Sequence, residues 1–173
     1  MKEGRIQKIS INDIIRLQKI AKQTFAETFA ENNTEENLQI YLEEGFSVEK
    51  LTSELNNPNA EFYFAIKENN PIGYLKINFG PAQTELQDDS SLEIERIYVL
   101  KEYHGQNIGQ LLFEKAHEIA KSKKVAYIWL GVWEENHRAL SFYKKNGFEV
   151  FNKHLFKLGS EEQTDLMMKL TLK

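Results

Sequence analysis

Apolar residues in the first third of the chain recur with the period of an α-helix. After a weakly alternating stretch at 5–9, a stripe spaced by three and four residues predicts a helix to about residue 30. The stripe consists of Ile14, Ile15, Leu17, Ile20, Ala21, Phe25 and Phe29. Ser10, Thr34 and Ser47 are N-cap residues by type and position, so we expect two shorter helices to follow this one.

The remainder of the chain combines strand patterns with two further helical segments. The predicted strands are 61–66, 72–78, 92–99, 125–132, 148–158 and 164–172. The first two surround a polar turn and predict a hairpin, and the last two predict a closing hairpin around 159–162. The run at 125–132 is nearly continuous, which is typical of a strand buried on both faces. The helical segments lie at about 108–120 and 136–145, and Asn146-Gly147 ends the second with a C-cap signal.

The strand at 92–99 changes phase halfway along its length. Leu92 and Ile94 lie on one face of the strand, whereas Ile97 and Val99 lie on the other. A β-bulge near Glu95 and Arg96 would produce this shift, and bulges re-aim side chains beside active sites. The alternative is that Glu93, Glu95 and Arg96 form the solvated face of an edge strand.

A glycine-bearing turn follows this strand and leads into the helix at 108–120. Gly105 and Gly109 allow the backbone to approach a ligand closely, and the start of a helix presents unpaired N–H groups at its positive end. The backbone of 104–110 could therefore hold a pyrophosphate. The alternative is a tight turn without a ligand.

Composition and charge exclude several function classes. The 173 residues, 41% of them hydrophobic, favour one domain with its own core. The absence of cysteine excludes disulfides, thiolate zinc sites and a cysteine nucleophile, and it agrees with a cytoplasmic location. A net charge of −4 lacks the basic excess of a nucleic-acid binder. No apolar run approaches the ~20 residues of a membrane span, and the four histidines show no metal-ligand spacing, so we expect no nucleic acid, membrane or metal partner.

The segment 27–54 is strongly acidic, with eight glutamates against one basic residue, Lys50. Such a surface would attract a polycation. The alternative is that these glutamates are the charged outer faces of amphipathic helices.

Two motifs resemble those of the GNAT superfamily of N-acetyltransferases. The segment 104–109 resembles the acyl-CoA pyrophosphate loop, whose pattern is Gln or Arg, two residues, Gly, one residue, Gly or Ala, with His104 and Asn107 as departures. Asparagine tolerates the left-handed conformation better than most residues. The segment 136–148 matches the pattern Asn-x-x-Ala-x-x-Phe-Tyr-x-x-x-Gly-Phe at every specified position. The alternatives for its polar residues are an N-cap at Asn136 and a core role for Tyr143.

The resemblance extends nearly end to end to PaiA-like polyamine N-acetyltransferases. Its blocks are ETF at 27–29, LEIERIY at 92–98, IWLGVWE at 128–134, FYKK at 142–145 and EEQTDL at 161–166. It implies a single α/β (α+β) domain over 1–173, with a mixed, mostly antiparallel sheet of about seven strands, a splayed or bulged central strand and flanking helices. It also implies acetyl transfer from acetyl-CoA to spermidine, spermine or a similar amine.

The resemblance also implies roles for individual residues. Glu95 is the expected base, acting through water, and Tyr143 the expected acid. Coenzyme binding is expected from Ile97, Tyr98, Val99, His104, Gly105, Gln106, Asn107, Ile108, Gly109, Gln110, Asn136, Ala139, Tyr143 and Lys145. The residues expected to line the acceptor cleft are Glu27, Glu31, Tyr41 and Trp133, and for Trp133 core packing is the alternative.

Three questions stay open at the level of sequence. The chain could be a CoA-binding sensor without turnover, or it could acetylate a protein N-terminus, a lysine or another small amine. A homodimer is compatible with the sequence.

Overall fold

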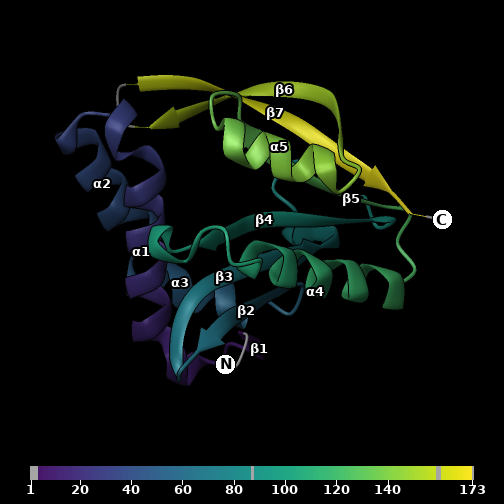
Figure 1. Cartoon of the computed structure of the whole chain (residues 1–173), viewed down its shortest axis with the longest axis horizontal. Helices are drawn as coiled ribbons and strands as arrows, with labels where there is room; N and C mark the ends of the chain where they lie inside the picture. Colours follow the sequence, from purple (N-terminus) through teal and green to yellow (C-terminus); the bar gives the residue numbers. More distant parts are fainter. Residues whose placement is uncertain (1–3, 87, 159–160, 173) are drawn as a thin grey trace.

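The computed structural model describes residues 4–86, 88–158 and 161–172 (Figure 1). Its helices and strands are β1 (Arg5–Lys8), α1 (Ile14–Phe29), α2 (Glu35–Gly45), α3 (Val48–Asn56), β2 (Ala60–Lys67), β3 (Asn70–Phe79), β4 (Ser91–Val99), α4 (Ile108–Ser122), β5 (Tyr127–Trp133), α5 (His137–Lys145), β6 (Glu149–Leu158) and β7 (Glu161–Thr171). Short 3-10 turns are η1 (Ile11–Asp13), η2 (Ala30–Asn32), η3 (Gly80–Ala82) and η4 (Lys101–Tyr103). The hairpin of β6 and β7 is confirmed, and residues 159–160 of its predicted turn lie outside the described residues.

The strands form one seven-stranded sheet in the order β1-β2-β3-β4-β5-β7-β6. Only the β4–β5 pair is parallel, and the other five pairs are antiparallel. The expected mixed, mostly antiparallel sheet flanked by helices is therefore confirmed. Three strand starts differ from the prediction by two residues or more. β5 begins at Tyr127 rather than Val125, because the Val125 N–H still donates to the Ala120 carbonyl of α4. β3 begins at Asn70 rather than residue 72, and β7 at Glu161 rather than residue 164, because these residues already pair with β2 and β6.

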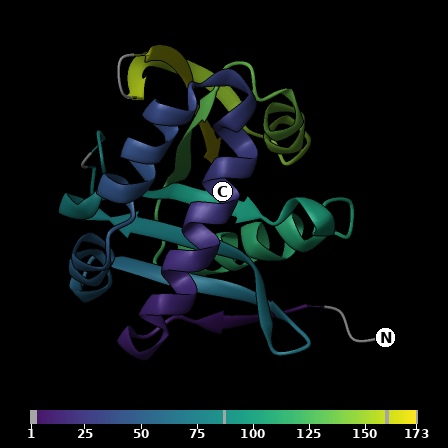
Figure 2. The same ribbon diagram turned by 90° about the vertical axis from the view of Figure 1, so that its left-hand side faces the viewer.

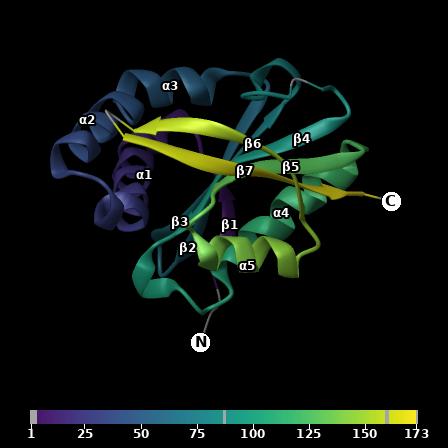
Figure 3. The same ribbon diagram turned by 90° about the horizontal axis from the view of Figure 1, so that it is seen from above.

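Helices cover both faces of the sheet. In Figures 2 and 3, α1, α2 and α3 lie on one side and α4 and α5 on the other. Each side has its own apolar core, one built around α4 and β4 and the other around α1 and β2. The predicted stripe of α1 faces the second core except for Ile15, which is 65% exposed. Ile15 was a wrong core prediction, because it stands two residues from Leu17 and so on nearly the opposite side of the helix.

Side chains cap the helices of the first third as expected. The hydroxyl of Thr34 accepts from the Asn37 N–H at 3.1 Å, and that of Ser47 accepts from the Lys50 N–H at 3.1 Å. At the first helix, Asp13 accepts from the Ser10 N–H at 3.0 Å, and η1 precedes the α-helical turns. These bonds satisfy N–H groups that a helix cannot pair internally.

Gly73 of β3 allows a close approach to β4. A β-carbon at this position would lie 2.8 Å from the Tyr98 carbonyl oxygen, which is backbone and cannot rotate away. Replacing Gly73 with alanine should therefore lower the free energy of unfolding by about 1–3 kcal/mol, measured by urea denaturation. Gly131→Ala is the matched control, because its nearest neighbour would be 3.9 Å away, and it should cost nothing. Equal stability of the two variants would contradict this prediction.

Candidate active site

The parallel strands β4 and β5 separate halfway along their length. They pair only from Ser91 to Ile94 with Tyr127 to Leu130. Beyond that point β4 is bonded to β3 alone, and the Leu100 N–H donates to the Ile72 carbonyl at 2.8 Å. Because backbone groups alternate in direction along a strand, those of Ile97 and Val99 point away from β3, into the opening between β4 and β5. This opening, which we call the splay, presents unpaired backbone groups to a ligand.

A β-bulge at Glu95 lies where the splay begins. Lys76 of β3 pairs with Arg96 and the next residue pairs with Ile94, so Glu95 is the extra residue. The bulge explains the change of phase in the sequence and confirms its predicted position. The solvated edge strand is excluded, because β4 is the central strand and Glu93 is 3% exposed.

Glu95 is held in a charged cluster under the bulge. Its carboxylate accepts from Lys76 Nζ at 2.5 Å and from Asn78 Nδ2 at 2.8 Å, and it pairs with Arg96 at 3.2 Å. Arg96 also forms two bonds of 3.0 Å to Glu54 of α3. Burial would raise the pKa of Glu95, but Arg96 and Lys76 outweigh it and lower that pKa to about 2. Glu95 is therefore ionised and is a weak proton acceptor.

The turn after β4 has the backbone expected of an anion site. Gly105 and Asn107 are left-handed, with φ of 81° and 65°, and α4 begins immediately after Asn107. The N–H groups of 108–110 have no partner within α4, and the first bond runs from the Leu111 N–H to the Asn107 carbonyl. A β-carbon on Gly105 would meet nothing within 4 Å, so space is open beside the turn.

Three side chains in and after this turn form hydrogen bonds with neighbouring elements of the protein. Nε2–H of His104 donates to the Val99 carbonyl at 2.9 Å, which supports the end of β4. Gln106 accepts from Lys67 Nζ at 3.0 Å. The side-chain amides of Gln110 and Asn146 form two hydrogen bonds with each other, of 3.0 and 3.2 Å, which join α4 to the residue that follows α5.

The helix α5 supplies the second predicted motif. Asn136 is its N-cap, and its side-chain oxygen accepts from the Ala139 N–H at 3.2 Å, as the alternative interpretation held. Tyr143 is 7% exposed and packs against Phe142 and Phe148. Among the described residues, none forms a hydrogen bond with its hydroxyl. Burial, with a contribution from Tyr98, raises the pKa of Tyr143, so the hydroxyl stays protonated at neutral pH. Lys145 is exposed in the last turn.

Residues 18–148 match the acetyltransferase (GNAT) family. The chain belongs to this family.

Relatives and solved structures support the same assignment for this GNAT enzyme, an N-acetyltransferase. An N-acetyltransferase of the pepI 3′ region of Lactobacillus delbrueckii subsp. lactis is 38% identical over 97% of both chains. The spermidine N(1)-acetyltransferase of Thermoplasma acidophilum is 31% identical over 84% of this chain and 88% of its own. The PaiA N-acetyltransferase of T. acidophilum, solved with coenzyme A, aligns with a TM-score of 0.82, 27% identity and coverage of 99% and 100%. The resemblance predicted from the motifs is confirmed.

Two of the residues predicted to line the acceptor cleft of this GNAT enzyme lie on the face covered by α1 and α2. Tyr41 stacks on Phe25 at 4.4 Å, and Phe29 contacts Trp133 at 5.5 Å. Trp133 also lines a cavity of about 230 Å³ with Asn32, Asn33, Glu134, Glu135, Glu162, Gln163 and Thr164. Tyr41 and Trp133 therefore belong to one aromatic group beside a polar cavity.

The two predicted glutamates are not part of this group. Glu27 accepts from the Lys101 N–H at 2.9 Å and supports the turn after β4. Glu31 is exposed in η2, next to the cavity but not among its lining residues. Seven of the eight glutamates of 27–54 are exposed, and Glu54 joins the charged cluster. The acidic stretch is thus mainly the outer face of the helices, because their apolar stripes face the core.

The sequence interpretation missed the residues that surround Glu95. Lys76 and Asn78 come from β3 and Glu54 from α3. Alternate polar positions in an otherwise apolar strand, as at Lys76 and Asn78, were a signal for a buried polar row. Asp165 of β7, which lies opposite Trp133, was also missed.

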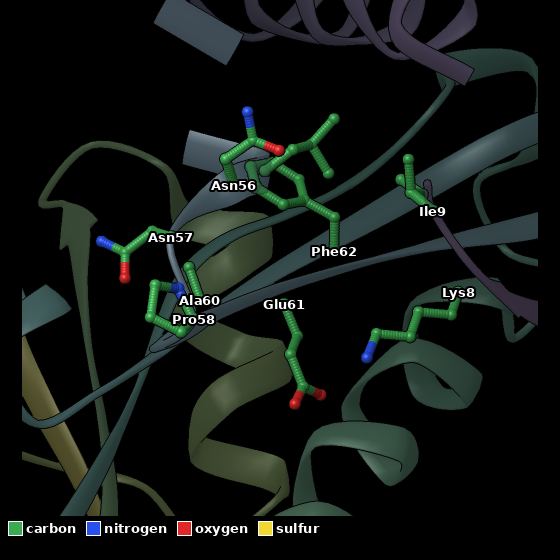
Figure 4. A pocket seen from close by; sticks show the side chains of 9 residues that line it. Lys8, Ile9, Asn56, Asn57, Pro58, Ala60, Glu61 and Phe62 are labelled. Carbon is green, nitrogen blue, oxygen red and sulfur yellow. The ribbon is translucent and has the colours of Figure 1, made fainter. Parts of the chain in front are cut away.

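A further cavity lies away from the splay. It measures about 220 Å³ and is formed by the end of β1, the start of β2 and the chain after α3, with Lys8 and Glu61 at its edge (Figure 4). Strand β3 separates it from β4. None of the described helices is long and apolar enough to cross a membrane. Within 4–86, 88–158 and 161–172, no three His, Cys, Asp or Glu side chains are grouped to hold a metal ion.

Proposed function

We propose that this enzyme transfers the acetyl group of acetyl-CoA to a primary amine, with polyamines as the acceptor class. The observation that carries the proposal is the splay, in which the N–H groups of Ile97 and Val99 face away from β3, next to the start of α4. The relative solved with coenzyme A supports the choice of coenzyme.

The described residues fit an acyl-CoA molecule. Unpaired N–H groups at 108–110 suit a pyrophosphate, and the space beside Gly105 admits it. The backbone of Ile97, Tyr98 and Val99 provides an edge to which an extended pantetheine arm can hydrogen-bond. Ala139 lies on the same face of α5 as Asn136, and its small side chain leaves room beside that residue. Asn136 Nδ2 takes no part in the cap, so it can donate to the coenzyme.

In this mechanism the chain orients the two substrates and moves protons. Acetyl-CoA supplies the acetyl group as a reactive thioester. The neutral amine nitrogen attacks the carbonyl carbon, the C–S bond breaks, and the Tyr143 hydroxyl donates a proton to the leaving sulfur. The nitrogen releases one proton to solvent as the amide forms, and a solvent proton restores the Tyr143 hydroxyl. N–H groups of the splay polarise the carbonyl. Glu95, with its pKa of about 2, positions the bulge more readily than it accepts a proton.

Three observations support a cationic acceptor. The cavity beside Trp133 carries Glu134, Glu135 and Glu162, whose charges attract ammonium groups, and the indole can contact a cation. The spermidine acetyltransferase of T. acidophilum is a relative at 31% identity.

The decisive experiment is incubation of the pure protein with acetyl-CoA and separate amines. The series includes spermidine, spermine, propylamine, a lysine peptide and a peptide with a free N-terminus. Thiol release and the mass of the product are measured. We expect the highest kcat/KM with a polyamine. Preference for a peptide would overturn the acceptor class, and tight CoA binding without turnover on any amine would favour a CoA sensor.

Asn107 provides a test of the pyrophosphate turn. Asn107→Gly should keep CoA affinity within about 3-fold, because glycine adopts the same left-handed backbone without strain. Asn107→Val should weaken CoA binding about 10-fold, because binding must restore a conformation that costs ~1–2 kcal/mol. Titration calorimetry with CoA measures both. Equal affinity of the two variants would mean that the turn does not bind the coenzyme.

A further inference from the structure

Asp165 occupies a position on β7 that faces the end of the splay. It pairs in register with Trp133 of β5 on one side and with His154 of β6 on the other. Its Oδ2 lies 3.9 Å from the place where a β-carbon of Gly131 would be. Gly131 is the first residue of β5 beyond its pairing with β4, so the carboxylate stands beside the widening of the splay.

Asp165 differs from the three carboxylates around the bulge, which have either cationic partners or several short hydrogen bonds. Glu54 and Glu95 share Lys76 and Arg96. Glu93 accepts three bonds of 2.6–2.9 Å from Asn78 and Thr84. In the described part of the chain, Asp165 has no ion pair with Lys or Arg, and the bond from Gln163 Nε2 is 3.5 Å long.

The imidazole of the neighbouring His154 forms its ion pair with another carboxylate, not with Asp165. Nδ1 of His154 lies 2.9 Å from a carboxylate oxygen of Glu85, so the ring is directed to the loop before β4. Burial raises the pKa of Asp165, although His154 and Gln163 act against it. Partial removal of a carboxylate from water without a cation is costly, and a cationic ligand would offset this cost.

Aromatic residues lie within the electrostatic range of the same carboxylate. Burial is the largest cause of the raised pKa of both Tyr41 and Tyr98, and the negative charge of Asp165 raises each pKa further. Both phenols are therefore within electrostatic reach of Asp165, and Trp133 is its neighbour on β5. Aromatic faces around a carboxylate are a favourable environment for an alkylammonium ion.

We propose that Asp165 binds the cationic amine of the acceptor and takes the proton that this amine must lose. The inference rests on the proposed function and adds the residue that recognises the reacting nitrogen. The ammonium ion transfers one proton to the carboxylate, which leaves the nitrogen with a lone pair. That lone pair forms the C–N bond to the thioester carbonyl carbon, the C–S bond breaks, and the sulfur leaves with a proton from Tyr143. The nitrogen then releases its second proton to solvent, a solvent proton restores the Tyr143 hydroxyl, and Asp165 releases the first proton, so one proton is released in each turnover. An alkylammonium ion has a pKa near ~10, so a carboxyl of raised pKa is a better acceptor than Glu95.

The test uses Asp165→Asn, which keeps the shape and removes the charge. Its control is Glu49→Gln, which removes one exposed charge on α3. With whichever amine the wild type prefers, we expect kcat/KM for Asp165→Asn to fall about 100-fold, with a raised amine KM and an unchanged KM for acetyl-CoA. The urea midpoint should not fall, because no internal cation loses its partner. Glu49→Gln should behave as the wild type.

Spermidine binding to the CoA-loaded protein, measured by calorimetry, separates the two proposals. If the wild type acetylates an amine and Asp165→Asn does so equally well, the inference is overturned and the proposed function stands. If the wild type acetylates no amine, the proposed function fails. In that case the ammonium site is still supported if the wild type binds spermidine and Asp165→Asn does not. Equal binding by both proteins, or none by the wild type, overturns the inference in that case.

Discussion

Replacing Tyr143 with phenylalanine should lower kcat about 1000-fold while CoA binds with its original affinity. The hydroxyl is the only part removed, and no described residue forms a hydrogen bond with it, so the packing against Phe142 and Phe148 should be retained. Its raised pKa keeps the proton available to a leaving thiolate across neutral pH. General acids of this kind contribute roughly 10²–10⁴-fold.

The measurements for this variant are thiol release under saturating substrates and calorimetric titration with CoA. Tyr127→Phe is the matched control, because its hydroxyl bonds to Asp88 at 3.1 Å, outside the splay, and the variant should keep full kcat. An unchanged kcat in Tyr143→Phe would remove the acid role. A loss confined to CoA affinity would make Tyr143 a binding residue only.

Replacing Arg96 with methionine should lower the free energy of unfolding by about 3–5 kcal/mol, because two carboxylates are then left with one cation. Arg96 has two bonds to Glu54 and an ion pair to Glu95, and Lys76 alone would remain for both. Urea denaturation measures the loss, with Arg138→Met on the exposed surface of α5 as the control.

A second substitution separates charge from packing in this cluster. Adding Glu54→Met to Arg96→Met leaves the pair of Lys76 and Glu95 intact, so most of the lost stability should return. If the double variant is no more stable than Arg96→Met, the loss comes from packing and the electrostatic account is wrong.

The pH dependence of stability provides an independent check on the same cluster. The pKa of Glu95 is lowered from 4.5 to about 2 in the folded protein. A lowered carboxyl pKa contributes stability above the unfolded value, and this contribution, about 3 kcal/mol, is lost as the pH falls from ~4.5 to ~2. Arg96→Met raises the pKa of Glu95, so its stability should fall less over that window. If Arg96→Met loses as much unfolding free energy as the wild type over this pH range, the lowered pKa of Glu95 is not due to Arg96.

Much of the fold could be predicted from local patterns. The helical stripe of α1 and the caps at Thr34 and Ser47 depend on residues within one or two turns. The bulge at Glu95 was also visible, because a change of face along one strand requires an extra residue. Ile15 was wrong because it stands nearly opposite Leu17 on α1, and the start of β5 was wrong because the Val125 N–H still bonds to the Ala120 carbonyl.

The strand-to-helix segment at 91–120 and the motif at 136–148 were identified from the chain alone, because short-range spacing specifies a turn, a helix start and a helix face. The partners of Glu95 were not, since Lys76, Asn78 and Glu54 reach it only when β3, β4 and α3 pack together. The same holds for Asp165, which comes beside Gly131 only through the pairing of β5 with β7. Local sequence thus specifies the turn and the helix starts that we propose for the coenzyme, whereas contacts between distant strands decide which carboxylates are paired with cations inside the protein.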